Sequence, residues 1–250
     1  ASTIFIPGLP NIALDLDVSI AMVQKMVPTY LAAFAIAQLI IGPLSDRFGR
    51  RIIVLCGIII FIIASLLCAF SDDISVLLIS RLAQATGACS TLVISRAIIR
   101  DTSEGVAAAR AMSYVAIAMA VGPIMAPFVG GFLTAWFGWR ATFIFTSSIG
   151  IIVFTSVFLM LKETLPPEKR NPPKVTQLFE TYRSLLRNKQ FACYSIIVAF
   201  ASGAMQAYIV SSPIIFIVVM GVKPEVFGFY IMVAVDHWNR DKLLLEVNIF

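Results

Sequence analysis

The residues best placed to do chemistry lie in segment 42–51, which joins two long apolar stretches. A carboxylate there stands within a few residues of several guanidinium groups, and such charges form ion pairs that can break and re-form as helices shift. We expect Gly42 and Gly49 to permit a tight turn between two helices. The alternative is a basic loop that only anchors the topology. The charged residues of the segment are Asp46, Arg47, Arg50 and Arg51.

A second candidate is Arg81, the one charge well inside an apolar stretch. Leaving a guanidinium in hydrocarbon costs at least about 2.5–3.5 kcal/mol, so such a residue normally faces a cavity or a partner and serves the function. Gln84, three residues on, lies on the same helix face and can hydrogen-bond nearby. Snorkelling of Arg81 to the membrane surface is the alternative.

A third candidate is segment 122–131, which is rich in small residues and proline. With Ala118, its small residues recur every four positions, a spacing that lets another helix approach closely. The two prolines are expected to bend the helix. Ordinary tight packing is the alternative. The residues concerned are Gly122, Pro123, Ala126, Pro127, Gly130 and Gly131.

The elements that must position these residues follow from composition. The chain has 250 residues, of which 59% are hydrophobic and only 13% charged, whereas soluble chains average about 25% charged. Apolar runs of about 20 residues, the length that crosses a bilayer, recur along it. This composition excludes a water-soluble fold, a disordered chain and a nucleic-acid-binding protein. It predicts an all-α polytopic protein in the lipid bilayer.

The predicted spans begin with an incomplete one. Residues 1–12 are apolar but too short to cross about 30 Å of hydrocarbon, and the chain opens on Ala1 rather than Met, so we expect the first span to have lost its beginning. An eighth span is expected to begin near Val226. The spans between them are predicted at residues 20–41, 52–70, 74–95, 111–135, 141–161 and 191–212.

Four regions are expected. Residues 1–161 form a six-span bundle, 162–190 a linker, 191–235 the first two spans of a second bundle, and 236–250 an atypical polar tail. The linker opens with prolines and continues with apolar residues at helical spacing, flanked by cations. This predicts a helix, either on the membrane surface or solvated and touching the bundle. The tail is either a truncated or frame-shifted end or a cytoplasmic loop.

Lys and Arg are distributed unequally between alternate loops. They gather after the second span, after the fourth and in the linker, while the opposite loops hold only Lys25, Arg140 and Lys223. Cytoplasmic loops carry the excess of positive charge, so the linker and the loops on its side are expected in the cytoplasm.

The three candidate segments resemble motifs of the major facilitator superfamily. Segment 42–51 is similar to its signature loop, segment 81–87 to its intramembrane arginine motif, and segment 122–131 to the motif of its drug:proton antiporter branch. Shorter segments look like the bicyclomycin and chloramphenicol resistance type of that branch. They are residues 6–13, 23–24, 100–101 and 163–166, and the resemblance covers about residues 1 to 235.

This resemblance implies a carrier of two six-span halves with its substrate between them, here one half and about two spans of the other, truncated at both ends. It implies proton-coupled efflux of small amphipathic drugs by alternating access, by a monomer in the bacterial inner membrane, with the proton gradient as energy source and no cofactor or metal. Asp46 and Arg50 would form a charge network with Asp101 that latches the outward-facing state. The coupling or substrate residues would be Arg81, Gln84 and Gly87.

A tolerant apolar pocket is expected from aromatic, methionine and glutamine side chains, although packing is the alternative for each. These are Tyr30, Phe34, Gln38, Tyr114, Met119 and Gln206. Where relatives often carry an acidic residue in the first span, this chain has Thr3, and the middle of each predicted span lacks Asp and Glu. An enzyme is not expected, because the one histidine, His237, lies in the tail. A non-transporting fragment and a carrier of a metabolite stay open as alternatives.

Overall fold

The computed structural model describes residues 3–166, 168, 170 and 175–221, and within them every regular element is helical. Five of its helices are long and apolar enough to cross a membrane, and α6 adds two shorter apolar stretches. The elements are η1 Ile6–Gly8, α1 Leu9–Asp15, α2 Ile20–Gln24, α3 Met26–Phe48, α4 Arg50–Ala69, α5 Ile74–Thr102, α6 Gly105–Phe137, α7 Arg140–Met160, α8 Val175–Arg187, α9 Lys189–Pro213 and η3 Ile214–Val219.

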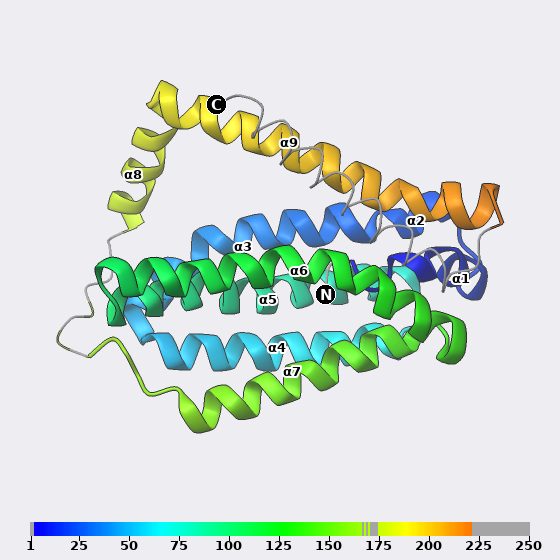
Figure 1. Cartoon of the computed structure of the whole chain (residues 1–250), viewed down its shortest axis with the longest axis horizontal. Helices are drawn as coiled ribbons and strands as arrows, with labels where there is room; N and C mark the ends of the chain where they lie inside the picture. The colour runs from blue at the N-terminus through cyan, green and yellow to red at the C-terminus, as the bar shows by residue number, and fades with distance from the viewer. Residues whose placement is uncertain (1–2, 167, 169, 171–174, 222–250) are drawn as a thin grey trace.

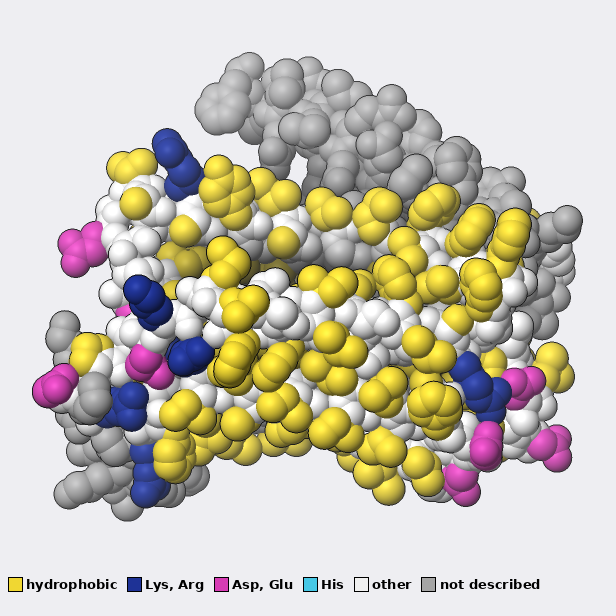
Figure 2. All heavy atoms as spheres, turned by 90° about the horizontal axis from the view of Figure 1, so that it is seen from below, with side chains coloured by type: hydrophobic (Ala, Val, Ile, Leu, Met, Phe, Trp, Pro, Cys, Tyr) yellow, Lys and Arg dark blue, Asp and Glu magenta, His cyan; other side chains and the backbone are white. Residues whose placement is uncertain are grey.

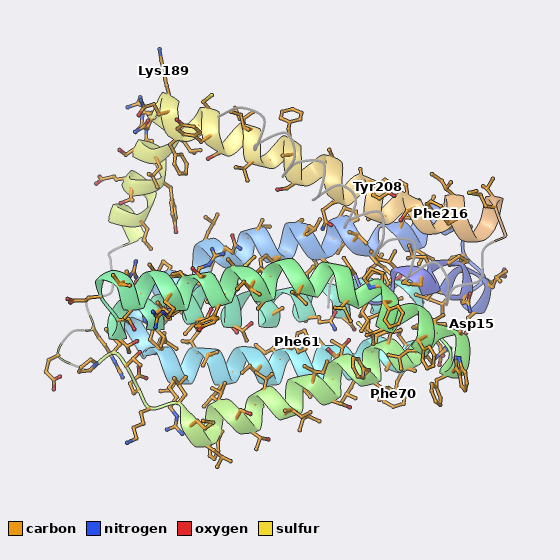
Figure 3. The ribbon with its side chains drawn as sticks, in the orientation of Figure 1. Asp15, Phe61, Phe70, Lys189, Tyr208 and Phe216 are labelled. Carbon is orange, nitrogen blue, oxygen red and sulfur yellow. The ribbon has the colours of Figure 1, made fainter. Side chains whose placement is uncertain are left out.

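The long helices α3 to α7 run side by side along the longest axis of the molecule (Figure 1). Helix α5 packs against both α3 and α4, and α4 packs against α7. Because successive helices are antiparallel, the turns gather at two ends, which we call the Gly49 end and the Trp139 end after a residue of each. Lys189 at the start of α9 lies at the Gly49 end, and Asp15 lies at the Trp139 end (Figure 3).

The surface has the distribution of side chains that a bilayer requires. Large apolar side chains are exposed along the middle of the helices, among them Ile36 at 60% and Ile152 at 66%. Figure 2 shows hydrophobic side chains over the middle of the face in view and charged ones gathered at its two ends. An apolar face of this extent, with charges confined to the two ends, matches the apolar middle and polar surfaces of a bilayer. The predicted all-α polytopic membrane fold is therefore confirmed.

Helices continue beyond the predicted spans at the Gly49 end. Helix α3 extends to Phe48 and passes through Gly42 and Pro43, so the prediction that Gly42 forms a turn is wrong. Charged residues can leave the bilayer on a helix as well as on a loop, and nothing after Pro43 interrupts the helix before Gly49. The turn consists of Gly49 alone, whose φ of +100° is disfavoured for every residue with a Cβ.

Helices α4 and α5 cross at a pair of glycines. A Cβ on Gly87 would lie 2.5 Å from the carbonyl oxygen of Gly57 and 2.6 Å from the backbone nitrogen of Phe61. The two backbones therefore touch. Helix α5 begins at Ile74, because the carboxylate of Asp73 accepts the backbone N–H of Ser75 at 2.5 Å, and this hydrogen bond lowers the pKa of Asp73.

Helix α6 is continuous through both predicted prolines, and its second half turns away from the line of its first half (Figure 1). Of the small residues, Gly130 makes the close approach: a Cβ there would lie 1.7 Å from the carbonyl oxygen of Ile4. The neighbour is thus the segment before η1, whereas Gly122 has open space around it. Pro127 and Gly131 are buried, and Ala126 is half-buried.

The predicted linker helix is present as α8, which stands at a steep angle to the long helices beside the Gly49 end and leads from there to α9 (Figure 1). The described part of residues 191–235, the predicted start of a second bundle, consists of α9 and the π-helical turn η3 after it. The eighth span expected near Val226 and the tail 236–250 lie outside the described residues.

Candidate functional site

Arg50 stands at the centre of the charge network at the Gly49 end. Its Nη1 lies 2.6 Å from Oδ1 of Asp46, and its Nε donates to Oδ2 of Asp101 at 3.0 Å. Ser45 Oγ accepts a further hydrogen bond from Nη1 at 2.5 Å. The Arg50 side chain is only 4% exposed, against 38% for Asp46 and 18% for Asp101. We call Asp46, Arg50 and Asp101 the latch, because they tie together α3, α4 and α5.

The other charged residues of the segment point elsewhere. Arg47 is exposed and lies over the ring of its neighbour Phe48, at 5.3 Å from the centroid. Arg51 reaches α7, where its Nη2 donates to the carbonyl oxygen of Phe158 at 2.8 Å. The carbonyl of Gly42 accepts the hydroxyl of Ser45 at 2.8 Å. The structure thus brings Asp46, Arg50 and Asp101 together, whereas Arg47 and Arg51 lie outside this network.

Glu163, for which the sequence suggested no role, holds the N-terminus of α4. Its carboxylate accepts the backbone N–H groups of Arg50 at 2.9 Å and Arg51 at 3.2 Å. A carboxylate at this position compensates the free N–H groups and the positive end of the helix dipole. A Cβ on Gly49 would lie 2.5 Å from Oε2 of Glu163, so a larger residue there would displace the capping carboxylate. The sequence contains one indication of this contact. The residue before α4 is Gly49, which has no side chain to cap the helix, so a cap had to come from elsewhere in the chain.

We expect Glu163→Ala to destabilise the protein by about 0.5–2 kcal/mol, the usual cost of losing a helix cap. Glu163→Gln should cost less, because the amide oxygen still accepts one N–H. Thermal unfolding in detergent, followed by far-UV circular dichroism, measures the difference. Glu168→Ala is the matched control, since Glu168 is exposed on the same linker. Equal midpoints for the two alanine variants would contradict the capping role.

A cavity of about 590 Å³ opens beside the latch, between α3, α5 and the start of α6. Arg96 crosses from α5 to α6, where its Nη2 lies 3.4 Å from Sδ of Met119. Because this cavity is lined by Asp46 and Arg50, it gives water a path to the latch from one side. Such access lowers the free-energy cost of separating the ion pairs. The charged residues that line the cavity are Asp46, Arg50, Arg96, Arg100 and Glu104.

Arg81 is completely buried in the bundle, which excludes snorkelling. Its guanidinium lies between two aromatic rings, with Cζ at 4.4 Å from the centroid of Phe5 and 4.4 Å from that of Tyr30. Aromatic faces attract a desolvated cation. Phe5 comes from the segment before η1 and Tyr30 from α3, so Arg81 joins the first part of the chain to α3 and α5.

A chain of hydrogen bonds extends from Arg81 to α4. Its Nη1 donates to Oε1 of Gln84 at 2.5 Å, and Nε2 of Gln84 donates to Oγ of Ser65 at 2.7 Å. Gln84 and Ser65 are both buried. Ser65 was not among the predicted residues, because its distance from Gln84 depends on how closely α4 and α5 cross. Gly87, predicted beside Arg81, provides that crossing.

The predicted pocket residues are spread over three helices. Tyr30 and Phe34 stack on α3 with ring centroids 6.1 Å apart, and Gln38 follows them on the same face but is exposed. On α6, Tyr114 is 67% exposed. Met119 contacts Arg96 as described above, and Gln206 lies half-buried on α9. The structure thus places Tyr30 against Arg81, with Phe34 next to Tyr30, and the cavity beside the latch has other lining residues.

A second charge network lies at the Trp139 end. Arg140 Nη1 pairs with Oδ2 of Asp15 at 3.0 Å, and its Nη2 pairs with Oδ1 of Asp72 at 2.9 Å. The indole N–H of Trp139 also donates to Oδ2 of Asp15, at 2.8 Å. These four residues join the end of α1, the α4–α5 turn and the start of α7. In the sequence, Arg140 contributed only to the predicted orientation of the chain in the membrane.

We expect Asp15→Ala to lower the stability by about 1–3 kcal/mol, because the indole N–H of the buried Trp139 then loses its acceptor. Asp15→Asn keeps an acceptor oxygen and should cost less than about 1 kcal/mol, the usual value of the exposed ion pair that it removes. Unfolding midpoints in detergent compare the two. Similar losses for both would show that the ion pair, rather than the indole hydrogen bond, matters.

A family model described as Major Facilitator Superfamily matches residues 1–235. The MFS-type transporter YdgK of Bacillus subtilis, itself uncharacterized, is 37% identical over 90% of this chain and 56% of its own length. A bicyclomycin resistance protein homolog of Haemophilus influenzae is 28% identical over 92% and 58%. Multidrug resistance protein D of Escherichia coli is 31% identical over 89% and 56%.

Among solved structures, a bacterial homolog of the human lysosomal transporter Spinster, inward-facing and unoccupied, superimposes with a TM-score of 0.74 at 23% identity. The match covers 94% of this chain and 56% of that one, and it shows the shared fold. The chain spans a little over half the length of its curated relatives. The predicted resemblance is confirmed over nearly the whole chain. The chain belongs to the major facilitator superfamily, whose members are membrane transporters rather than enzymes.

Proposed function

We propose that the protein carrying this chain exports small amphipathic drugs from the cytoplasm of a bacterium in exchange for protons, by alternating access. The observation that carries the proposal is the latch, in which the nearly buried Arg50 pairs with carboxylates from two other helices. The names of two relatives, a bicyclomycin resistance protein homolog and a multidrug resistance protein, support drugs as the substrate class. The proposed carrier works as a monomer without a cofactor.

The latch suits a two-state device. While its ion pairs are intact, α3, α4 and α5 are held together at the Gly49 end, and separating them leaves a buried guanidinium without a counter-ion. The cavity beside the latch provides water to the separated charges. Interfaces with two such arrangements switch between them rather than deform gradually. The excess of Lys and Arg at the Gly49 end supports a cytoplasmic location for it.

Arg81 supplies the fixed charge of the proposed mechanism. A buried cation favours the ionised form of a nearby acid and attracts electron-rich parts of a substrate. Its neighbours Phe5 and Tyr30 offer aromatic faces of the kind that amphipathic drugs contact. The proposed substrate site therefore lies beside this buried cluster, at the half-buried Phe34 that stacks on Tyr30, and the other half of the carrier would complete it.

The test is efflux of a fluorescent amphipathic dye from energised cells. Cells make either this chain or a form extended to the length of its relatives, with and without a protonophore. We expect the extended form to pump and the protonophore to stop it. Failure of both forms to pump, although both insert into the membrane, would exclude amphipathic drugs. Pumping that persists with the protonophore would exclude proton coupling.

A further inference from the structure

A proline inside α3 leaves one backbone carbonyl without its helical partner. In an α-helix the carbonyl of residue 39 accepts the N–H of residue 43, but residue 43 is Pro43, which has no N–H, and its ring crowds that carbonyl. Leu39 lies on the outside of the bundle, 54% exposed. A carbonyl at such a place gains from any donor that reaches it, because lipid offers none.

The donor comes from the linker helix. The hydroxyl of Tyr182 on α8 donates to the carbonyl oxygen of Leu39 at 2.9 Å, across 143 residues of sequence. Tyr182 is half-buried, whereas Leu186 on the next turn is 73% exposed. Helix α8 meets α9 at their junction and has few contacts with the bundle. This hydrogen bond is therefore a large part of what attaches α8 to α3.

We propose that Tyr182 is a positioning residue that docks the linker helix on the carbonyl freed by Pro43. The attachment lies close to the latch, since Pro43 precedes Asp46 by less than one helical turn. When the Gly49 end of α3 moves, the linker moves with it and transmits the motion to α9. The docking stands on the geometry alone, and only its effect on transport rests on the proposed function.

The docking is tested by trypsin cleavage of the full chain in lipid nanodiscs. Trypsin cuts after Arg183 and Arg187 of α8, and cleavage of a locally opened helix tracks the population of the open form. Tyr182→Phe keeps the ring but removes the donor. We expect it to speed cleavage at these sites about two- to tenfold, the range of one hydrogen bond. Cleavage after the exposed Lys162 serves as the internal reference.

A double-mutant cycle makes the test specific. Pro43→Ala restores the backbone N–H at position 43, so the Leu39 carbonyl regains its helical donor. In that background Tyr182→Phe should change cleavage by less than twofold. Tyr194→Phe on α9, where Tyr194 is 70% exposed, is the matched control and should have no effect. Equal acceleration in both backgrounds, or none in either, would overturn the docking.

Dye efflux by the extended form then separates the two proposals. If Tyr182→Phe speeds cleavage and slows efflux, while Tyr194→Phe does neither, the linker transmits the motion of α3. If cleavage speeds up and efflux stays at the parent rate, the transmission is refuted and the docking stands. Should the parent form not pump, the proposed function fails, and the cleavage cycle still decides the docking.

Discussion

Arg50→Gln is expected to abolish dye efflux by the extended form while leaving its membrane insertion intact. The substitution removes the cation shared by Asp46 and Asp101 and leaves two carboxylates facing one another across α3 and α5. Removing one partner of a buried pair costs about 3–5 kcal/mol, and the 18% and 38% exposure of the carboxylates reduces that figure here. Asp46→Asn should also stop efflux, because the latch loses one of its two ion pairs.

Arg47→Gln is the matched control for the latch. Arg47 lies three residues before Arg50, in the last turn of α3, and carries the same charge, but it is exposed and contacts only the neighbouring ring of Phe48 among the described interactions. Its efflux should equal that of the parent. Membrane-fraction blots establish equal expression of all variants. A well-expressed Arg50→Gln or Asp46→Asn variant that pumps normally would remove the latch from the mechanism.

Arg81→Met is expected to abolish efflux without unfolding the bundle. Methionine fills much of the space between Phe5 and Tyr30, and exchange of a buried charge for an apolar side chain of similar volume is often neutral for stability. The charge, however, is lost. Arg81→Ala should stop efflux as well, but it should also lower the unfolding midpoint, because it opens a cavity that costs about 2–5 kcal/mol.

Efflux and thermal unfolding together decide the role of Arg81. A fall in efflux for Arg81→Met at an unchanged midpoint assigns a functional role to the charge. Arg110→Gln, at an exposed position on α6, controls for the change in net charge and should leave both measurements unaltered. Parent-level efflux by Arg81→Met would show that Arg81 is a packing residue only.

The membrane fold could be read from the sequence because the bilayer imposes one rule on every span. Hydrocarbon satisfies no backbone group, so each long apolar run had to be a helix, and the predicted runs correspond to α3 to α7 and α9. The same rule singled out Arg81 as a residue needing a partner inside the protein. The ends of the helices were less predictable, since water outside the bilayer tolerates helix and loop alike, and α3 therefore continued through Gly42 to Phe48.

Only the tertiary structure decided which polar groups meet. Glu163 lies more than a hundred residues from the helix start that it caps, and Asp15 lies as far from Trp139 and Arg140. Tyr182 meets a carbonyl whose need for a donor is evident from Pro43, but the identity of the donor is not. Hydropathy is a local property and can be read along the chain, whereas these contacts depend on how helices cross, which the close approach of Gly57 and Gly87 sets in three dimensions.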